Sequence, residues 1–175
     1  CAGTGYGPDG TVWGGEVLLA SAGEFERAAF LAPVPMPGSA AAIKEPWRMA
    51  VSYLDHAFGD RFRDLDIAFL DAVDRAQADI LVTMGRQGVN APLTSSLGRL
   101  FDGVAALCGL RQRVAFEGQA AMELEMAAGA GEAGRYDFNW TVSDKHEGRR
   151  IEIAPIIQGV VADLARGIAV ARISR

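Results

Sequence analysis

The stretch "NAPLTSSLGRLFDGVAALCGL", residues 90–110, carries the clearest helix signal in the chain. Pro92 pushes the residue before it out of the helical region and so marks a turn, and the hydroxyl residues 94–96 are suited to cap the helix that follows. Apolar residues at helical spacing predict that this helix buries a stripe made of Leu97, Leu100, Phe101, Val104 and Cys108. Arg99 and Asp102 lie off that stripe, so they form either a solvated face or part of a ligand site.

Upstream of this helix, two extended segments and a proline-rich stretch are predicted. Residues 15–20 and 25–31 read as strands, and the second runs into "PVPMPG", residues 33–38. Three prolines within five residues are incompatible with a helix or a central strand. We therefore expect residues 33–38 to be an extended linker on the surface.

Most of the remaining chain is predicted to be helical. Pro46 suits the first turn of a helix, and apolar residues at helical spacing continue to Phe58. Further segments are expected downstream: one or two helices in 65–88, a helix in 118–128, a strand pair near 135–154 and a helix from 155 onward. The chain is therefore predicted to be a mixed α/β, helix-rich unit over 1–175, extended and glycine-rich in 1–38 and helical in 39–175.

Composition argues against several classes of protein. Half of the 175 residues are hydrophobic, so the chain is long and apolar enough for one domain with a real core. The net charge is −5 with acids and bases interspersed, which disfavours nucleic acid as a partner because such binding needs clustered Lys and Arg. No apolar run approaches the ~20 residues of a membrane span, so no membrane partner is expected. Cys1 and Cys108 make no disulfide framework, and we expect reduced thiols in a cytoplasmic protein.

Both ends of the chain look cut. It begins at Cys1 instead of a methionine, shows no signal peptide, and stops just after a helical segment. We therefore expect residues 1–175 to be a piece of a longer protein.

The glycine-dense stretch that begins at residue 3 is a weak candidate for a phosphate site. The backbone N–H groups of Gly3, Thr4 and Gly5 are of the kind that cradles a phosphate. The stretch is neither a Walker loop nor a dinucleotide fingerprint, since no lysine or helix follows at the needed spacing. An ordinary hairpin is the alternative, and the residues alone leave both open.

The sequence gives little support for a metal site or for a catalytic nucleophile. His56 and His146 are far apart and lack ligand-type neighbours at helical spacing, so no metal site is predicted within this chain. The hydroxyls at 94–96 are explained by helix capping. Cys1 at a cut terminus is not a credible nucleophile, and no catalytic residue is assigned.

Asp102 and Glu123 form a more informative pair. Each is expected on a helix, and the loop between the two helices ends in "FEGQ", residues 116–119. Angled helices would bring both carboxylates to one edge, where they accept hydrogen bonds from vicinal hydroxyls such as those of ribose. The alternative is a solvated face, which spacing alone favours.

Five motifs in order resemble the HypF family, the carbamoyltransferases that mature nickel-iron hydrogenases. Besides residues 90–110, they are "GTGYGPDGTVWGGE" (3–16), "FERAAFLAPVPMPG" (25–38), "IKEPWRMAVSYL" (43–54) and "FEGQAAMELE" (116–125). The resemblance implies the C-terminal transfer domain of that family, which has the actin-like ATPase (ribonuclease H-like) fold and is similar to the universal tRNA threonylcarbamoyltransferase. A chain of this length would hold part of that fold, with an incomplete sheet.

In that relative the matching helix, loop and helix hold the ribose of a nucleotide. Carried over to this chain, the role falls on Asp102, on Gly118 or Gln119, and on Glu123. The resemblance makes ribose binding the preferred interpretation, with ATP or carbamoyl-adenylate as the ligand.

The resemblance also implies a reaction. Carbamoyl phosphate and ATP form carbamoyl-adenylate, and the carbamoyl group then passes to the C-terminal cysteine of a HypE-like partner. A divalent metal is expected near the phosphates of the full-length protein as a Lewis acid, but the HxxxH motif, the SGG-type loop and the further acidic ligand of the family are absent here. The family also has an aspartate where this chain has Ala2. We therefore expect residues 1–175 to be inactive alone.

Two other functions remain open: a small-molecule O-carbamoyltransferase of the same fold, and a non-catalytic module that docks the partner.

The helix pattern also predicts how two substitutions change the stability of the chain. Phe101→Ala should remove a core side chain at a cost of about 3–5 kcal/mol. Asp102→Ala, if Asp102 is a ligand residue, should cost under ~1 kcal/mol.

Overall fold

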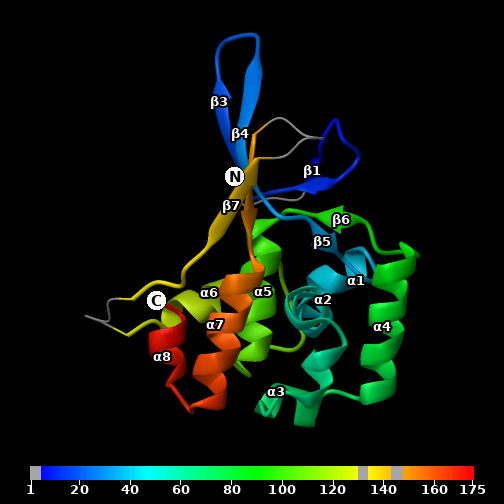
Figure 1. Cartoon of the computed structure of the whole chain (residues 1–175), viewed down its shortest axis with the longest axis vertical. Helices are drawn as coiled ribbons and strands as arrows, with labels where there is room; N and C mark the ends of the chain where they lie inside the picture. Colours follow the sequence, from blue (N-terminus) through cyan, green and yellow to red (C-terminus); the bar gives the residue numbers. More distant parts are fainter. Residues whose placement is uncertain (1–4, 130–133, 143–147) are drawn as a thin grey trace.

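The computed structural model describes residues 5–129, 134–142 and 148–175. It is a mixed α/β protein, as predicted, with two four-stranded sheets and a larger helical part. Figure 1 shows the helices gathered at one end of the molecule, while a long hairpin projects from the other.

Both sheets combine parallel and antiparallel pairs. The first has the order β1-β2-β6-β5, and only its β2–β6 pair is parallel. The second has the order β3-β4-β8-β7, and only its β4–β8 pair is parallel. The strands are β1 (Gly5–Tyr6), β2 (Val12–Trp13), β3 (Glu16–Ala20), β4 (Phe25–Leu31), β5 (Val34–Pro35), β6 (Leu93–Thr94), β7 (Asn139–Val142) and β8 (Arg149–Glu152). The strands predicted at 15–20 and 25–31 are thereby confirmed as the projecting hairpin β3–β4.

The helices surround α2, which packs against α4, α5 and α7. They are α1 (Ala40–Lys44), α2 (Pro46–Phe58), the 3-10 helix η1 (Gly59–Asp64), α3 (Ala68–Ala72), α4 (Arg75–Gln87), α5 (Leu97–Leu107), α6 (Gln119–Ala127), α7 (Ala154–Ala165) and α8 (Val170–Ile173). The predicted helix at 46–58 is confirmed, and the segment 65–88 forms two helices. Gly88 ends the second of these in the left-handed conformation, at φ 68°, which glycine adopts without strain.

The stretch 33–38 is extended, but its predicted place on the surface is wrong. Val34 and Met36 are buried, and Val34 pairs with Thr94 of β6. The Ser52 hydroxyl of α2 donates a hydrogen bond to the Pro35 carbonyl at 2.6 Å. The prolines are tolerated because this strand is short and its carbonyl groups find partners outside a regular ladder. The stretch is part of the core instead of a linker over it.

The buried side of α5 also differs from the prediction. Leu100 and Val104 are buried, as predicted, but Phe101 is 41% exposed. The helix approaches α2 through Gly103, where a Cβ atom would lie 2.6 Å from the Tyr53 ring. Side chains on that helical face are Arg99, Asp102, Gly103 and Ala106, and all are buried. Because α5 packs closely on α2 at Gly103, the helical face that carries Arg99 and Asp102 is buried. The solvated-face interpretation of these two residues is therefore wrong.

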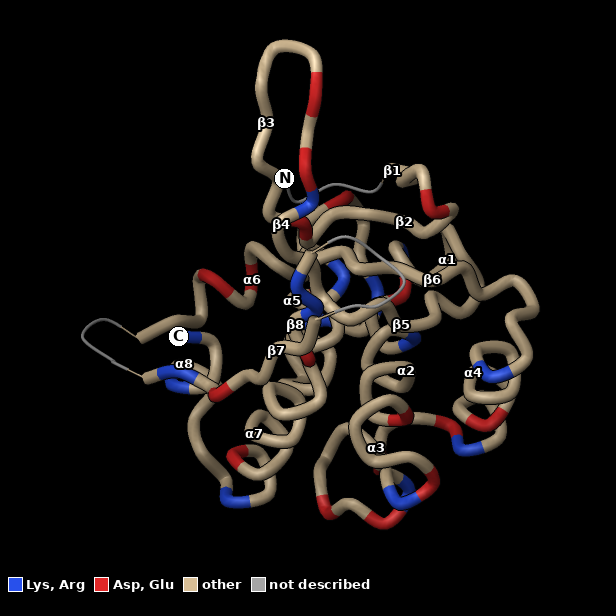
Figure 2. The backbone as a smooth tube through the Cα atoms, turned by 45° about the horizontal axis from the view of Figure 1, so that its top comes forward, with Lys and Arg blue, Asp and Glu red and all other residues tan. Residues whose placement is uncertain are grey.

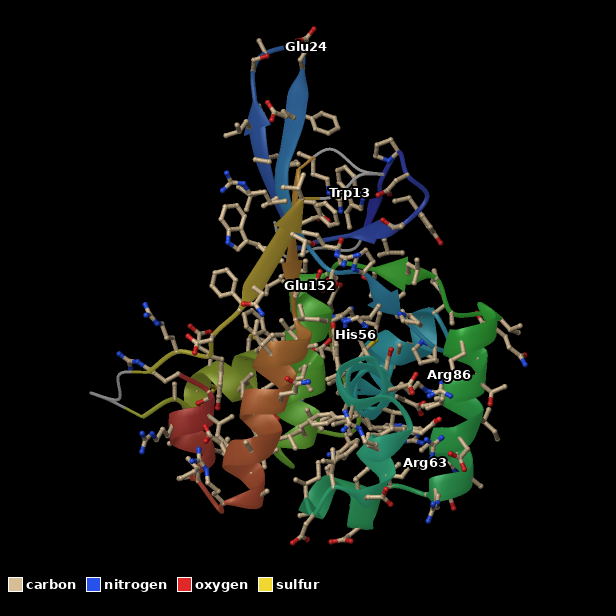
Figure 3. The ribbon with its side chains drawn as sticks, viewed as in Figure 1. Trp13, Glu24, His56, Arg63, Arg86 and Glu152 are labelled. Atoms are coloured by element: carbon tan, nitrogen blue, oxygen red, sulfur yellow. The ribbon has the colours of Figure 1, made fainter. Side chains whose placement is uncertain are left out.

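Surface charge is mixed around the lower helices. Figure 2 shows acidic and basic residues interspersed around α3 and α4. Arg86 of α4 lies 2.5 Å from Asp55 and 2.8 Å from Asp60, and Arg63 and Arg86 face the same region (Figure 3). Exposed pairs of this kind contribute little to stability. None of the helices in the described ranges has the length and apolar character to cross a membrane.

Cys108 follows α5 and is partly buried, and burial raises the pKa of its thiol to about 12. At pH 8 the thiolate is then scarce. We expect Cys108 to react with a disulfide reagent roughly a thousandfold more slowly than an ordinary thiol. The measurement uses a Cys1→Ser variant, with the denatured chain as the reference for full reactivity. Reaction in the native chain as fast as in the denatured one would contradict the expectation.

Candidate nucleotide site

The glycine-rich segment forms a hairpin where the structure describes it. Gly5 pairs with Trp13 and Tyr6 with Val12, while Gly3 and Thr4 lie outside the described residues. The turn between the strands is closed by Asp9, whose Oδ1 accepts hydrogen bonds from the Thr11 amide at 3.0 Å and from the Trp13 indole at 2.9 Å. The hairpin alternative is therefore confirmed from Gly5 onward, and a phosphate role for the glycines stays a prediction.

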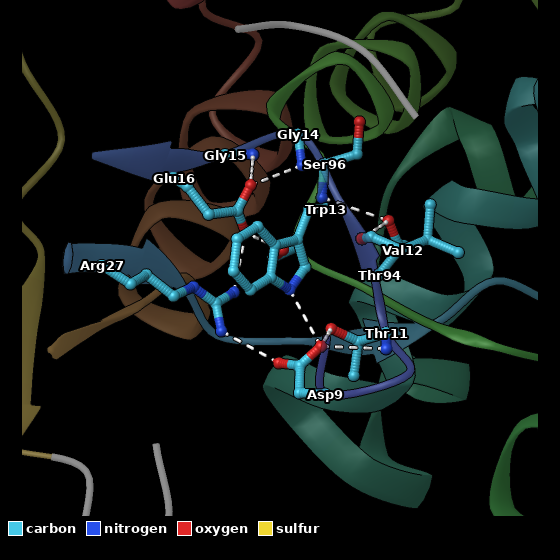
Figure 4. A network of polar contacts seen from close by, with 11 residues as sticks. Asp9, Thr11, Val12, Trp13, Gly14, Gly15, Glu16, Arg27, Thr94 and Ser96 are labelled. Atoms are coloured by element: carbon cyan, nitrogen blue, oxygen red, sulfur yellow. Dashed lines mark hydrogen bonds and ion pairs between the residues drawn. The ribbon is translucent and has the colours of Figure 1, made fainter. Parts of the chain in front are cut away.

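Arg27 of β4 contacts Asp9 and Trp13 of this hairpin and is only 6% exposed. Its guanidinium lies between two aromatic rings, 4.1 Å from the centre of Trp13 and 3.9 Å from that of Phe30. It also pairs with two carboxylates, Asp9 at 3.0 Å and Glu16 at 2.7 Å (Figure 4). The buried cation is thus neutralised by one acid from the hairpin turn and one from the strand that follows it.

Glu16 connects this network to the start of α5. Its Oε2 accepts hydrogen bonds from the amides of Gly14 at 2.6 Å and Gly15 at 2.9 Å (Figure 4), and its Oε1 accepts one from the Ser95 hydroxyl. A Cβ atom at Gly15 would lie 2.2 Å from the Ser95 carbonyl oxygen, so this close approach requires glycine. The network therefore holds the glycine-rich hairpin against the residues that begin α5.

Asp102 lies further along α5, with its side chain only 3% exposed. Its Oδ2 is 2.6 Å from the Nη2 of Arg99, which is equally buried. Within the part of the chain that the structure describes, the Nε and Nη1 of Arg99 have no hydrogen-bond partner. Burial raises the pKa of Asp102; the positive charge of Arg99 opposes this shift and the negative charge of Glu117 adds to it. The pair is thus desolvated and incompletely hydrogen-bonded, which is an unusual state for buried ionic groups.

Glu123 of α6 occupies the more accessible edge. Arg111 donates two hydrogen bonds to its carboxylate, from Nε to Oε2 at 2.8 Å and from Nη2 to Oε1 at 2.6 Å. The Gln119 amide donates a third, at 3.0 Å to Oε1. The hydrogen bonds from Arg111 and Gln119 lower the pKa of Glu123, so its carboxylate is ionised near neutral pH. The side chain of Glu123 remains 28% exposed.

Gly118 turns the chain into α6. Its backbone is left-handed, with φ 79°, and it occupies the N-cap position of the helix. A hollow of about 450 Å³ lies against the preceding residues of the loop, up to Glu117. The hollow is lined by Ile43, Lys44, Val114, Ala115, Phe116 and Glu117. Open space therefore lies beside the loop that precedes Gln119 and Glu123.

The structure brings some of the predicted site residues together. Gln119 and Glu123 are in direct contact, and Gly118 begins the same helix, which packs on α5. Asp102 is buried on α5 against Arg99, and Gly5 belongs to the separate hairpin held by Glu16. The described residues 5–129, 134–142 and 148–175 hold no group of three or more His, Cys, Asp or Glu side chains arranged for a metal ion.

Sequence reasoning singled out Arg99 but not its ion pair with Asp102, and it missed Arg111 and Arg27. Arg99 stands three residues before Asp102 on one helix, and that spacing was a usable signal for an ion pair. Arg111 and Arg27 gave no such signal, because their partners lie 12 residues away at Glu123 and 18 away at Asp9.

Comparison with known proteins identifies the family of the chain. Residues 1–175 match the family described as "Carbamoyltransferase, Kae1-like Domain, second subdomain". The chain is 48% identical over 127 residues to the carbamoyltransferase HypF of Rhodobacter capsulatus, covering 72% of this chain and 16% of that protein. It is 37% identical over 174 residues to HypF of Synechocystis sp., covering 92% of this chain and 22% of that protein.

Two solved structures have the same fold. One is full-length HypF in a phosphate- and nucleotide-bound form, with a TM-score of 0.87 and 37% identity over 98% of this chain and 22% of that one. The other is HypF of T. kodakarensis, with a TM-score of 0.77 and 27% identity over 98% of this chain and 23% of that one. The fold therefore defines a Kae1-like domain of the actin-like class. The chain belongs to the HypF family of carbamoyltransferases, as its motifs predicted, and it spans about a fifth of the length of the relatives it matches.

Proposed function

We propose that this chain supplies nucleotide contacts to a HypF carbamoyltransferase. The full reaction would pass a carbamoyl group from carbamoyl-adenylate, made from carbamoyl phosphate and ATP, to the C-terminal cysteine of a HypE-like protein. The observation that carries the proposal is the edge of α6. There the ionised carboxylate of Glu123, held by Arg111 and Gln119, is 28% exposed.

The proposed contacts divide between two helices. Glu123 accepts a hydrogen bond from one ribose hydroxyl, and Gln119 keeps the carboxylate oriented, because charge-assisted bonds to a fixed acceptor are the strong ones. Gly118 leaves room for the sugar because it has no side chain. Asp102 contacts the second hydroxyl only after its carboxylate leaves Arg99, since the pair is buried in the structure.

We further propose that residues 1–175 do not catalyse transfer alone, because they span between 16% and 22% of the matched HypF proteins. A divalent metal would polarise the phosphoanhydride as a Lewis acid. The described residues offer no acidic or histidine cluster for that ion. The residues of this chain bind and orient the nucleotide.

The test is calorimetric titration of the chain with a non-hydrolysable ATP analogue. Glu123→Gln should weaken binding at least tenfold, because it removes the charged acceptor for a ribose hydroxyl. Glu125→Gln, an exposed acid on the same helix, is the matched control and should leave the affinity unchanged. If the two substitutions change the affinity equally, or if neither changes it, Glu123 does not contact the nucleotide.

The acceptor of the carbamoyl group is tested separately, in a full-length HypF polypeptide that carries residues 1–175 at the matching position. Transfer to a HypE-like C-terminal cysteine supports the proposed reaction. Transfer to a small-molecule hydroxyl would support the alternative of an O-carbamoyltransferase. Binding of the HypE-like protein without nucleotide dependence, unaffected by Glu123→Gln, would support a docking module.

A further inference from the structure

The second sheet carries apolar side chains from β3, β7 and β8 on one face. Paired residues in a sheet point to the same side, so the register shows which side chains share a face. Val17 pairs with Ala29, Ala29 with Arg149, and Arg149 with Val142. Trp140 pairs with Ile151 on the same side, and Leu19 lies two residues after Val17. We call this surface the apolar sheet face: Val17, Leu19, Trp140, Val142, Arg149 and Ile151.

The apolar sheet face is largely open to solvent. Val17 is 53% exposed, Leu19 60%, Trp140 51% and Val142 80%. Arg149 adds one cationic group, stacked 3.7 Å over the Trp140 ring. Figure 3 shows that the β3–β4 part of this sheet extends away from the helices, with Glu24 at its tip. Contiguous exposed apolar residues of this kind mark an interaction surface.

The other side of the same sheet is packed around Phe30, although Leu18 and Phe25 further along the hairpin are 44% and 57% exposed. The ring of Phe30 is fully buried and the Arg27 guanidinium lies over it. A bulge in β4 between Ala29 and Arg27, the partners of Val17 and Leu18, places the side chains of Arg27 and Phe30 on the same, inner side. The sheet is therefore buried locally, around Phe30, whereas the described residues of the apolar sheet face at Trp140 and Val142 stay 51% and 80% exposed. Sheets in folded domains bury their apolar faces against another layer.

We propose that the apolar sheet face packs against a segment of the HypF polypeptide that lies outside residues 1–175. The length of a solved HypF supports a covering segment from the same polypeptide. That structure matches 98% of residues 1–175 with a TM-score of 0.87, and the matched part is only 22% of the solved HypF. The same sheet thus exists within a polypeptide more than four times as long. The covering segment is apolar and places a carboxylate opposite Arg149, because a buried guanidinium needs a charged partner. This inference rests on family membership and not on the proposed nucleotide site.

The test compares one substitution in two settings. Val142→Lys is made in residues 1–175 alone and in a full-length HypF polypeptide that carries residues 1–175 at the matching position. Val89→Lys is the matched control, because Val89 is an exposed valine remote from this sheet, just after α4. Val142→Lys should leave the melting temperature of the isolated chain within about 1 °C and lower that of the full-length protein by more than about 5 °C. Val89→Lys should have no effect in either.

Amide hydrogen exchange gives a second readout that needs no substitution. Residues 139–142 should exchange at least tenfold more slowly in the full-length protein than in the isolated chain, because the covering segment excludes water. Equal exchange in the two, or equal melting shifts of Val142→Lys in both settings, would overturn the proposal. A defined dimer of the isolated chain in sedimentation, abolished by Val142→Lys, would overturn it too and identify a second copy as the occupant.

Discussion

Asp102→Ala is expected to lower the free energy of unfolding by about 3–5 kcal/mol, because it leaves the Arg99 charge buried without a partner. The two side chains are 5% and 3% exposed and lie 2.6 Å apart. Two further nitrogens of Arg99 find no hydrogen-bond partner among the described residues, so none of these residues replaces the lost carboxylate. Phe101→Ala should cost less than about 1.5 kcal/mol, since that ring is 41% exposed. This order reverses the one that the helix pattern predicts.

Chemical denaturation of four proteins checks this order: the unmodified chain, Asp102→Ala, Phe101→Ala and the double variant Arg99→Met/Asp102→Leu. The double variant should recover most of the loss, because apolar side chains of similar size replace a buried pair at little cost. A larger loss for Phe101→Ala than for Asp102→Ala would contradict the buried-pair interpretation. A double variant as unstable as Asp102→Ala would show that the site needs a polar pair.

The pH dependence of the same pair has a defined sign. Burial raises the pKa of Asp102 in the folded chain, with Arg99 opposing and Glu117 adding to the shift. The folded state therefore binds the proton more tightly than the unfolded state does. The stability that this group contributes is fully present below the unfolded pKa and is lost as pH rises through the folded pKa. Asp102→Asn should remove this component from a series of denaturation curves measured across that range.

Arg27→Met should have the second large effect, also about 3–5 kcal/mol of unfolding free energy. It removes the cation between Asp9 and Glu16, and the Glu16 side chain is only 6% exposed. It also removes the stacking of the guanidinium on Trp13 and Phe30, for which each contact of this kind contributes on the order of 1 kcal/mol. Arg27→Lys should lose less, because an ammonium keeps the charge but cannot bridge both acids in the same plane.

Arg149→Met is the matched control for Arg27, since Arg149 also stacks on a tryptophan but is exposed. It should cost under ~1 kcal/mol. Amide exchange at Gly14 and Gly15 tells a local effect from a global one: Arg27→Met should speed exchange there, because Glu16 accepts hydrogen bonds from both amides. Equal stability losses for the two arginine variants would mean that Arg27 is no more than a surface charge.

Local chemistry in the chain was enough to predict many of the elements. Pro46 and the apolar spacing after it predicted α2, and the hydroxyls before Leu97 predicted the start of α5, where the Ser96 side chain does accept from the Arg99 amide. Capping and periodicity act within a few residues, so they are visible in sequence. Family membership followed from five motifs in order, and the match over residues 1–175 confirms it.

The parts that sequence reasoning got wrong or missed depend on long-range packing. Gly103 lets α5 approach Tyr53 closely, and this contact turns Asp102 inward and Phe101 outward. Pairing with Thr94 buries Val34 in a stretch whose prolines predicted a surface linker. The partners of Arg27 come from another strand and a distant turn. Periodicity predicts that a helix has an apolar side, but the neighbouring elements decide which side chains lie between them, because a protein interior is close-packed. The local sequence determined many of the helices and strands of this protein, whereas long-range packing in the tertiary structure determined which of its charged groups are buried.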